Sequence, residues 1–222
     1  VVCKPVYDYG ATEAEIELGS NHLRFTGFSS EMRLTTNLSL NYILEGRYFS
    51  LSDPKYFVLT FGIPLEGPLE RTVDDFLHKT TFYWQNWVKQ CKIGEFQQDQ
   101  VIRSALTLKL HQYEDTGAII ASATTSLPES QGAGRNWDYR FCWMRDSFYT
   151  LRGLHGVGHF HEMEKYARYI NNITLSEDGR YHPVYNLMGD TDFPEVEMPL
   201  SGYMGNHPVR VGNAARNHVQ ND

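Results

Sequence analysis

The stretch Arg135–Ser147 (RNWDYRFCWMRDS) holds the side chains of this sequence that are best suited to chemistry. It contains two Trp, one Tyr, one Phe, three Arg and two Asp. Flat aromatic rings stack on the C–H faces of a pyranose, and Arg and Asp make charge-assisted hydrogen bonds with its hydroxyls. The composition therefore indicates a sugar-binding cleft. The alternative is a helix start whose aromatic side chains pack in a core, because structural ion pairs resemble functional sites.

The same stretch resembles the signature of glycoside hydrolase family 15, which contains glucoamylases, α-glucosidases and some trehalases. Three further segments resemble the family in the same order along the chain. They are PVYDYGA at Pro5–Ala11, TTSLPES at Thr124–Ser130 and GYMGNHPVRVGNAA at Gly202–Ala215. The resemblance spans nearly the whole chain, and TTSLPES is similar to bacterial members in particular.

The resemblance implies an α+β multidomain fold, with an antiparallel β-sandwich followed by an α/α toroid of six helix hairpins. The predicted helices are too few to close such a ring. We therefore expect residues 1–66 to be part of the β-sandwich, 67–94 a linker and connecting helix, and 95–222 the first part of the toroid. Asp222 aligns with the residue that leads into the rest of the toroid, so the sequence resembles an internal section of a longer chain.

The N-terminal part of the sequence carries a strand pattern. Glu31–Leu40 alternates with a period of two, which predicts a strand. One face of this strand carries Met32, Leu34, Thr36, Leu38 and Leu40, and the other carries mainly polar residues. His22–Phe28 and Tyr56–Gly62 are further predicted strands. Short strands separated by Gly, Asn and Ser indicate an antiparallel sandwich.

Helical spacing begins after the Pro- and Gly-marked linker Ile63–Glu70. Thr72, with Asp75 three residues later, resembles a capping box and predicts a long connecting helix over Thr72–Gln90. Further helices are predicted over Gln98–Tyr113, Met144–His155 and His161–Ile173, and a last helix near Asn213. Loops are predicted over Asp115–Gly134 and Leu175–Asn213. Because long structureless loops are uncommon unless functional, the family-like motifs on these loops favour a site there.

Family members cleave α-glucosidic bonds with inversion of configuration. This needs an acid that protonates the leaving oxygen and a base that activates water, about 6.5–9.5 Å apart. In the family both are Glu residues of later toroid loops, so we expect no catalytic residue in this chain and place both downstream of Asp222. The loop carboxylates Glu129, Glu195 and Glu197 are expected to be solvated rather than to transfer protons.

The resemblance does assign substrate-binding residues. The family's Trp-x-Arg-Asp-Ser run holds the non-reducing glucose, and a Tyr lies four residues before the Trp. The matching candidates here, together with an Arg from a later loop, are Tyr139, Trp143, Arg145, Asp146 and Arg210. Support is expected from Trp137, Asp138, Arg140 and Glu195, with Asp138 pairing with Arg140 or Arg135. The alternative for Arg145 and Asp146 is an ion pair that only holds the helix start in place.

Charge and cysteine content limit the possible partners. The net charge is −7, from 20 Lys and Arg against 27 Asp and Glu, and no basic run occurs. Nucleic acid and membranes are therefore not expected as partners. Cys3, Cys91 and Cys142 lack metal-ligand spacing and favour a reducing cytosol, and the histidines of His155–His161 are not expected to bind metal. We expect no metal, no cofactor and a cytoplasmic protein. Secretion and oligomerisation stay open.

Three functions follow from the resemblance, all with α-linked glucose in an oligosaccharide or polysaccharide as the expected partner. The first is an inverting, exo-acting glucosidase of the glucoamylase type, and the second is a trehalase. The third is a non-catalytic, carbohydrate-sensing glucoamylase-like module. A Trp-Glu loop and a late Glu beyond this sequence would favour an enzyme, and their absence would favour a sensor.

Overall fold

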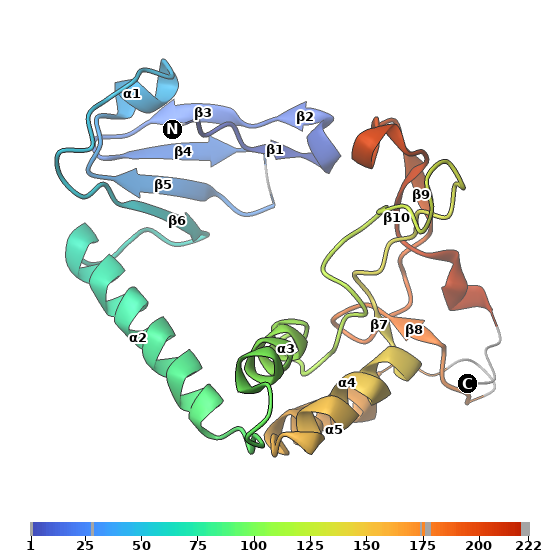
Figure 1. Cartoon of the computed structure of the whole chain (residues 1–222). Coiled ribbons are helices and arrows are strands. Elements are labelled where there is room, and N and C mark those ends of the chain that lie inside the picture. The colour runs from blue at the N-terminus through green and yellow to red at the C-terminus, as the bar shows by residue number, and fades with distance from the viewer. Residues whose placement is uncertain (1, 28, 174, 176–178, 219–222) are drawn as a thin grey trace. The chain divides into compact units, whose positions relative to one another are not determined.

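The computed structural model describes residues 2–27, 29–173, 175 and 179–218, so the expectation on Asp222 lies outside the described residues. The chain separates into two compact units, Val1–Gln85 and Asn86–Asp222 (Figure 1). The structure mixes helices with small antiparallel sheets, as the predicted α+β class requires. The β-sandwich and the toroid stay predictions.

The first unit is built on a four-stranded antiparallel sheet in the order β3-β4-β5-β6. Its strands are β3 (Glu15–Leu18), β4 (His22–Thr26), β5 (Met32–Thr36) and β6 (Phe57–Phe61). A separate ladder pairs β1 (Val6–Tyr7) with β2 (Thr12–Glu13) around the 3₁₀ turn η1 (Asp8–Gly10). The strands predicted within His22–Phe28, Glu31–Leu40 and Tyr56–Gly62 are therefore confirmed, with shorter bounds.

The pairing register gives the sheet one apolar and one polar face. Leu23 lies opposite Leu18 on one side and Leu34 on the other, so all three share a face. Leu38 and Ile43 cover the centre of this face. The opposite face carries paired polar residues, such as His22 opposite Thr35. The hydrophobic effect thus fixes which way each strand faces.

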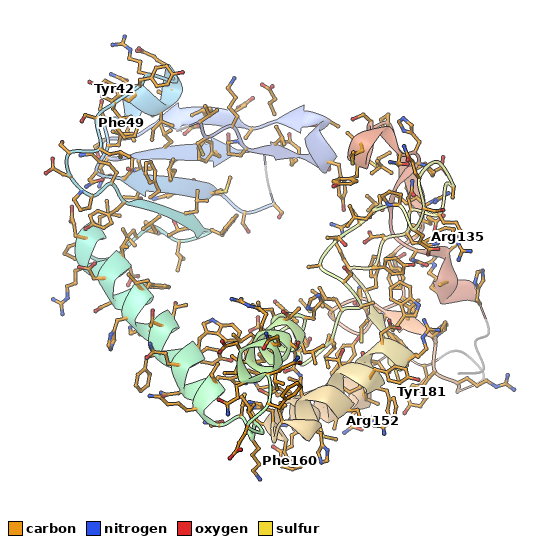
Figure 2. The ribbon with its side chains drawn as sticks, viewed as in Figure 1. Tyr42, Phe49, Arg135, Arg152, Phe160 and Tyr181 are labelled. Carbon is orange, nitrogen blue, oxygen red and sulfur yellow. The ribbon has the colours of Figure 1, made fainter. Side chains whose placement is uncertain are left out.

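The strand predicted over Glu31–Leu40 ends at Thr36, so its last residues were wrongly assigned. The Thr36 hydroxyl accepts a hydrogen bond from the Leu38 amide at 3.1 Å, which turns the chain away from the sheet. A short helix, α1 (Leu40–Leu44), follows and was not predicted. Figure 2 shows Tyr42 of α1 beside Phe49, and their rings stack with centroids 6.3 Å apart.

The long helix α2 (Leu69–Lys89) begins earlier than predicted, and the capping box at Thr72 is wrong. Thr72 lies inside the helix, where its hydroxyl donates to the Pro68 carbonyl at 2.9 Å and its amide donates to the same oxygen. Thr72 therefore bonds back to the preceding turn instead of capping the amides that follow it. Pro68 suits the helix start because it has no N–H that needs a partner.

Among the described residues of the second unit, three α-helices that follow the end of α2 pack in sequence order. They are α3 (Gln98–Leu110), α4 (Met144–Gly156) and α5 (His161–Asn171), and α4 packs against both others. The predicted helices are confirmed, although α3 stops short of Tyr113. The amides of His111 and Gln112 bond to carbonyls only three residues back, which tightens and ends the helix. No helix within the described ranges has both the length and the apolarity to cross a membrane.

Two short antiparallel strand pairs connect segments of the second unit that lie outside its helices. β7 (Cys142–Trp143) pairs with β8 (Val184–Tyr185), and β9 (Val196–Met198) pairs with β10 (Val209–Val211). Two 3₁₀ turns, η2 (Tyr203–Gly205) and η3 (Ala214–Asn217), complete this region. The helix predicted near Asn213 is η3, and the Asn213 side chain caps it by accepting from the Ala215 amide.

A buried polar network joins the end of α2 to α3 and α5. The indole of Trp87 stacks on His159, with ring centroids 3.8 Å apart, and donates to Glu162 Oε1 at 2.8 Å. Lys109 Nζ lies 3.6 Å from the same carboxylate, and both side chains are only 3% exposed. Gln112 donates to the Glu162 backbone carbonyl at 2.9 Å. Isolated buried charges are costly, so these contacts specify how the helices pack.

The network shifts two pKa values. Burial opposes ionisation of Glu162, but the Trp87 hydrogen bond, the backbone and Lys109 outweigh it and hold the carboxyl pKa below its ordinary value. Burial also lowers the pKa of His159, against the attraction of Glu162. For both groups the folded state binds protons less readily than the unfolded state. Stability should therefore fall on acidification, first below the ordinary histidine pKa and then as the carboxyl protonates.

We predict that Lys109→Met lowers the free energy of unfolding by about 3–5 kcal/mol, because it leaves the buried Glu162 carboxylate without its cation. Lys165→Met is the matched control, since Lys165 pairs with the same Glu114 as Lys109 but is more exposed, at 19% against 3%. The control should cost about 1 kcal/mol or less. Urea unfolding measures both changes. The wild type and Lys109→Met should converge in acid as Glu162 protonates, and equal losses at neutral pH would contradict the prediction.

Candidate functional site

The Trp-x-Arg-Asp-Ser run lies where β7 passes into α4. Trp143 ends β7 and precedes the helix with extended backbone, and the Met144 amide donates to the Pro183 carbonyl at 3.2 Å. Arg145 and Asp146 therefore fall in the first turn of α4, where the helix dipole favours a negative charge. Ser147 is fully buried, and its hydroxyl donates to the Ile119 carbonyl at 3.3 Å. This bond attaches the start of the helix to the segment around Ile119.

Arg145 and Asp146 form a half-exposed ion pair. Arg145 Nη2 lies 3.3 Å from Asp146 Oδ2, and the side chains are 48% and 38% exposed. Exposed pairs of this kind contribute about 0–1 kcal/mol to stability. The pair therefore does little to hold the helix start, and both side chains remain accessible to a ligand.

Tyr139 and Trp143 lie beside this pair but differ in burial. Their rings are 5.8 Å apart and tilted by 56°. Trp143 is only 5% exposed and packs with Val184 and Phe193, so most of its ring belongs to the core. The Tyr139 hydroxyl donates to Glu129 Oε1 at 3.0 Å. Burial and then Glu129 raise the pKa of Tyr139, and the charge of Asp146 adds to the increase.

Arg210 on β10 is held by a second group of residues. Its guanidinium lies 4.5 Å from the ring centroid of Trp137 and donates to the Gly134 carbonyl at 2.9 Å. Glu195 and Glu197 each lie 3.3 Å from it, and the Arg210 side chain is only 13% exposed. Contacts within the protein therefore use much of the hydrogen-bonding capacity of this guanidinium. Arg210 is better placed to fix the loops than to grip a ligand by itself.

Asp138 supports the site from inside the protein. Its carboxylate is completely buried and accepts from Arg140 Nε at 2.9 Å and Arg140 Nη2 at 2.8 Å. It also accepts from the Gly212 amide at 3.2 Å, and the Asn213 side chain donates to its carbonyl at 3.1 Å. Of the two expected partners, Asp138 takes Arg140. Asp138 thus joins the Arg135–Ser147 stretch to the Gly202–Ala215 motif.

The three loop carboxylates that were expected to be solvated are all ion-paired, which corrects the expectation. Glu129 binds Arg135 at 2.9 Å as well as Tyr139, and Figure 2 shows Arg135 on the loops beside β9 and β10. Glu195 binds Arg210 and also accepts from the Ala214 amide at 3.2 Å. These opposite charges hold the carboxylates close to the loops. Glu197 also accepts from Arg210 Nη2 at 3.3 Å, although its side chain is 66% exposed.

Several residues that shape the site were not predicted. Asn206 accepts from the Gly132 amide at 2.8 Å and so ties the loop after Glu129 to the later motif. Ser126 accepts from the Arg210 amide at 2.7 Å. At Gly212 the backbone φ is +78°, and a Cβ would lie 2.0 Å from the Pro194 carbonyl oxygen. The TTSLPES and GYMGNHPVRVGNAA motifs held this information, but only the folded backbone pairs them.

The three histidines His155, His159 and His161 contact different partners. His155 packs edge-on against Phe160, His159 joins the buried network, and His161 lies 3.5 Å from Glu164. In the part of the chain that the structure describes, no group of three or more His, Cys, Asp or Glu side chains could hold a metal ion.

We predict that Asp138→Asn lowers the free energy of unfolding by about 1–3 kcal/mol, because the new amide nitrogen cannot accept from Arg140 or from Gly212. Asp115→Asn is the control, since Asp115 is exposed and accepts from Tyr113. It should change stability by about 0.5 kcal/mol or less. Thermal unfolding measures both. If Asp138→Asn is as stable as the control, the hydrogen bonds of Asp138 to Arg140 and Gly212 do not stabilise the fold.

Comparison with known proteins identifies the family. The sequence model of glycosyl hydrolases family 15 matches residues 95–222. A trehalase of Thermoplasma volcanium is 34% identical over 99% of this chain and 36% of its own length. A trehalase of Mycolicibacterium smegmatis is 33% identical over 99% of this chain and 36% of its own length. Trehalase 1 of Sulfolobus acidocaldarius is 37% identical over 77% of this chain and 29% of its own length. The chain spans about a third of the length of these relatives. No solved structure matches it. Because the family match covers more than half of its residues, the chain belongs to glycosyl hydrolases family 15.

Proposed function

We propose that the intact protein is an inverting glycosidase that cleaves trehalose into two glucose molecules. The names of the relatives support trehalose over the longer α-glucans of the glucoamylase reading. They also support an enzyme over a carbohydrate sensor. The family membership of the chain supports glycoside hydrolysis itself.

The observation that carries this proposal is the half-exposed pair of Arg145 and Asp146 beside the Tyr139 hydroxyl. A guanidinium and a carboxylate in the first turn of one helix offer both donors and acceptors to adjacent sugar hydroxyls. In this proposal the pair holds the non-reducing glucose, and Tyr139 flanks the ring. Trp143 backs Tyr139 from the core. Arg210 and Glu195 keep the neighbouring loops in place.

The proposed site positions one glucosyl unit, and proton transfer comes from outside the 222 residues. An inverting enzyme needs two carboxyl groups on opposite faces of the scissile bond. Glu129 and Glu195 are each paired with an arginine, which favours a structural role for both. The acid and the base are therefore proposed to lie in the remaining part of the intact protein. Positioning by the described residues lowers the barrier by fixing the glucose for attack.

We predict that Asp146→Ala in the intact enzyme lowers kcat/KM for trehalose roughly a hundredfold, or about 2.7 kcal/mol. Loss of the carboxylate leaves sugar hydroxyls without their acceptor in the transition state. The melting temperature should change little, because the Arg145–Asp146 pair is exposed.

Asp115→Ala is the matched control for this measurement, because it removes an exposed Asp of the same unit that bonds Tyr113. It should keep kcat/KM within about threefold of wild type. If folded Asp146→Ala also stays within about threefold, the pair at the start of α4 is structural and the site assignment is wrong.

The substrate and the stereochemistry can be tested together. We predict that the intact enzyme has a higher kcat/KM for trehalose than for maltose or maltotriose. Proton NMR at early times should detect α- and β-glucose in equal amounts from trehalose, because inversion changes the configuration of only one of the two glucose units. Formation of α-glucose alone would contradict inversion. A preference for maltotriose would favour the glucoamylase reading over the trehalase.

A further inference from the structure

The loop that precedes Tyr139 is closed by hydrogen bonds of its own backbone. The Glu129 amide donates to the Arg135 carbonyl at 3.3 Å, so the two ends of the loop meet. The Gly132 amide donates to the Asn206 side chain at 2.8 Å, which attaches the loop to the later motif. The backbone therefore fixes the point from which the Glu129 side chain extends.

The Glu129 side chain uses its two oxygens for two different partners. Oε1 accepts from the Tyr139 hydroxyl at 3.0 Å, and Oε2 lies 2.9 Å from Arg135 Nε. The Glu129 side chain is 38% exposed and that of Arg135 is 66% exposed. Exposed ion pairs stabilise a fold little, so stability alone gives little reason for this arrangement.

The hydrogen bond to Glu129 decides what the Tyr139 oxygen offers to a ligand. A phenol carries one proton, and Tyr139 donates it to Glu129. Toward any other group the Tyr139 oxygen can then only accept a hydrogen bond. Arg145, by contrast, has only donors. One sugar hydroxyl can therefore donate to Tyr139 while another accepts from Arg145.

Tyr139 connects Glu129 to the residues proposed to hold glucose. Burial and then Glu129 raise the pKa of Tyr139. The charge of Asp146 adds to this increase, so the phenol lies within the field of both carboxyl groups. The ring of Tyr139 also lies 5.8 Å from that of Trp143, which packs in the core. Trp143 thus holds the ring of Tyr139, and Glu129 holds its hydroxyl.

We propose that Glu129 is a positioning residue of the sugar site, which orients Tyr139 so that its oxygen accepts a hydrogen bond from a glucose hydroxyl. Glu129 acts only through Tyr139 and transfers no proton. This inference rests on the proposed function, because it places glucose against Arg145, Asp146 and Tyr139. The alternative is that Glu129 serves only to pair with Arg135.

A double-mutant cycle in the intact enzyme tests whether Glu129 acts through Tyr139. Glu129→Ala and Tyr139→Phe should each lower kcat/KM for trehalose about tenfold, because each removes the same hydrogen bond. The double variant should also lose about tenfold, since both changes break one interaction. Additive losses, or a Glu129→Ala enzyme within about twofold of wild type, would overturn the proposal.

Glu129→Gln separates hydrogen bonding from charge. Glutamine keeps a carbonyl oxygen that can accept from Tyr139, but it loses the charge that attracts Arg135. This variant should therefore keep kcat/KM within about threefold of wild type. A loss as large as that of Glu129→Ala would overturn the proposal in favour of the ion pair with Arg135.

Glu45→Ala is the matched control. It breaks another exposed pair of a glutamate with an arginine, in which Glu45 is 47% and Arg47 62% exposed, and it lies in the first unit. Its kcat/KM should stay within about twofold of wild type. A loss equal to that of Glu129→Ala would overturn a specific role of Glu129.

Tyrosine ionisation gives a readout that does not depend on the reaction. Because Glu129 adds to the effect of burial on the pKa of Tyr139, Glu129→Ala should let this phenol ionise at lower pH. The difference in ultraviolet absorbance between each protein and its Tyr139→Phe counterpart isolates this titration. An unchanged titration in Glu129→Ala would show that the hydrogen bond is not formed and would overturn the proposal.

Glucose binding separates this proposal from the proposed function. If the intact protein leaves trehalose uncleaved, the proposed function fails, and the same cycle is measured as the Kd for glucose by calorimetry. Glu129→Ala, Tyr139→Phe and the double variant should then weaken binding by the same factor. Unequal, additive factors would overturn the role of Glu129 whatever reaction the enzyme catalyses.

Discussion

The candidate site depends on one buried carboxylate, that of Asp138. It accepts two hydrogen bonds from the Arg140 side chain and one from the Gly212 amide, and it is completely excluded from solvent. A charge in this position is tolerated only when its partners are fixed. The interaction therefore holds two segments about seventy residues apart in a single arrangement, since Asp138 and Gly212 must meet. β10, the strand that carries Arg210, ends beside this contact and pairs with β9.

The two aspartates of Arg135–Ser147 illustrate how environment separates roles within one motif. Asp138 is buried with its bonds filled by the protein, whereas Asp146 is 38% exposed and shares one weak ion pair. Sequence similarity treats both as family-like residues. Burial distinguishes them, because a carboxylate that is already saturated has no acceptor left for a ligand, and an exposed one does.

Sequence patterns predicted the long elements well and the short ones poorly. The helices α3, α4 and α5 and the strands β4, β5 and β6 have enough residues for a period to be visible. β7 and β8 have two residues each, so no period exists, and their pairing depends on contacts distant in sequence. The start of α2 was missed because Thr72 competes for the backbone in a way that a cap motif does not reveal. For the site, the motif named Tyr139 and Asp146, but the contacts of Glu129 and Asn206 required the fold.

The close backbone approach at Gly212 has a consequence for how resemblance to the family should be interpreted. With φ at +78° and the Pro194 carbonyl 2.0 Å from any added Cβ, this position admits glycine on steric grounds alone. Its agreement with the family motif therefore carries information about the course of the main chain and none about the sugar that is cleaved. Enzymes with different substrates can share this glycine for the same reason. Exposed side chains such as those of Tyr203 and Met204, at 58% and 83%, are not constrained in this way.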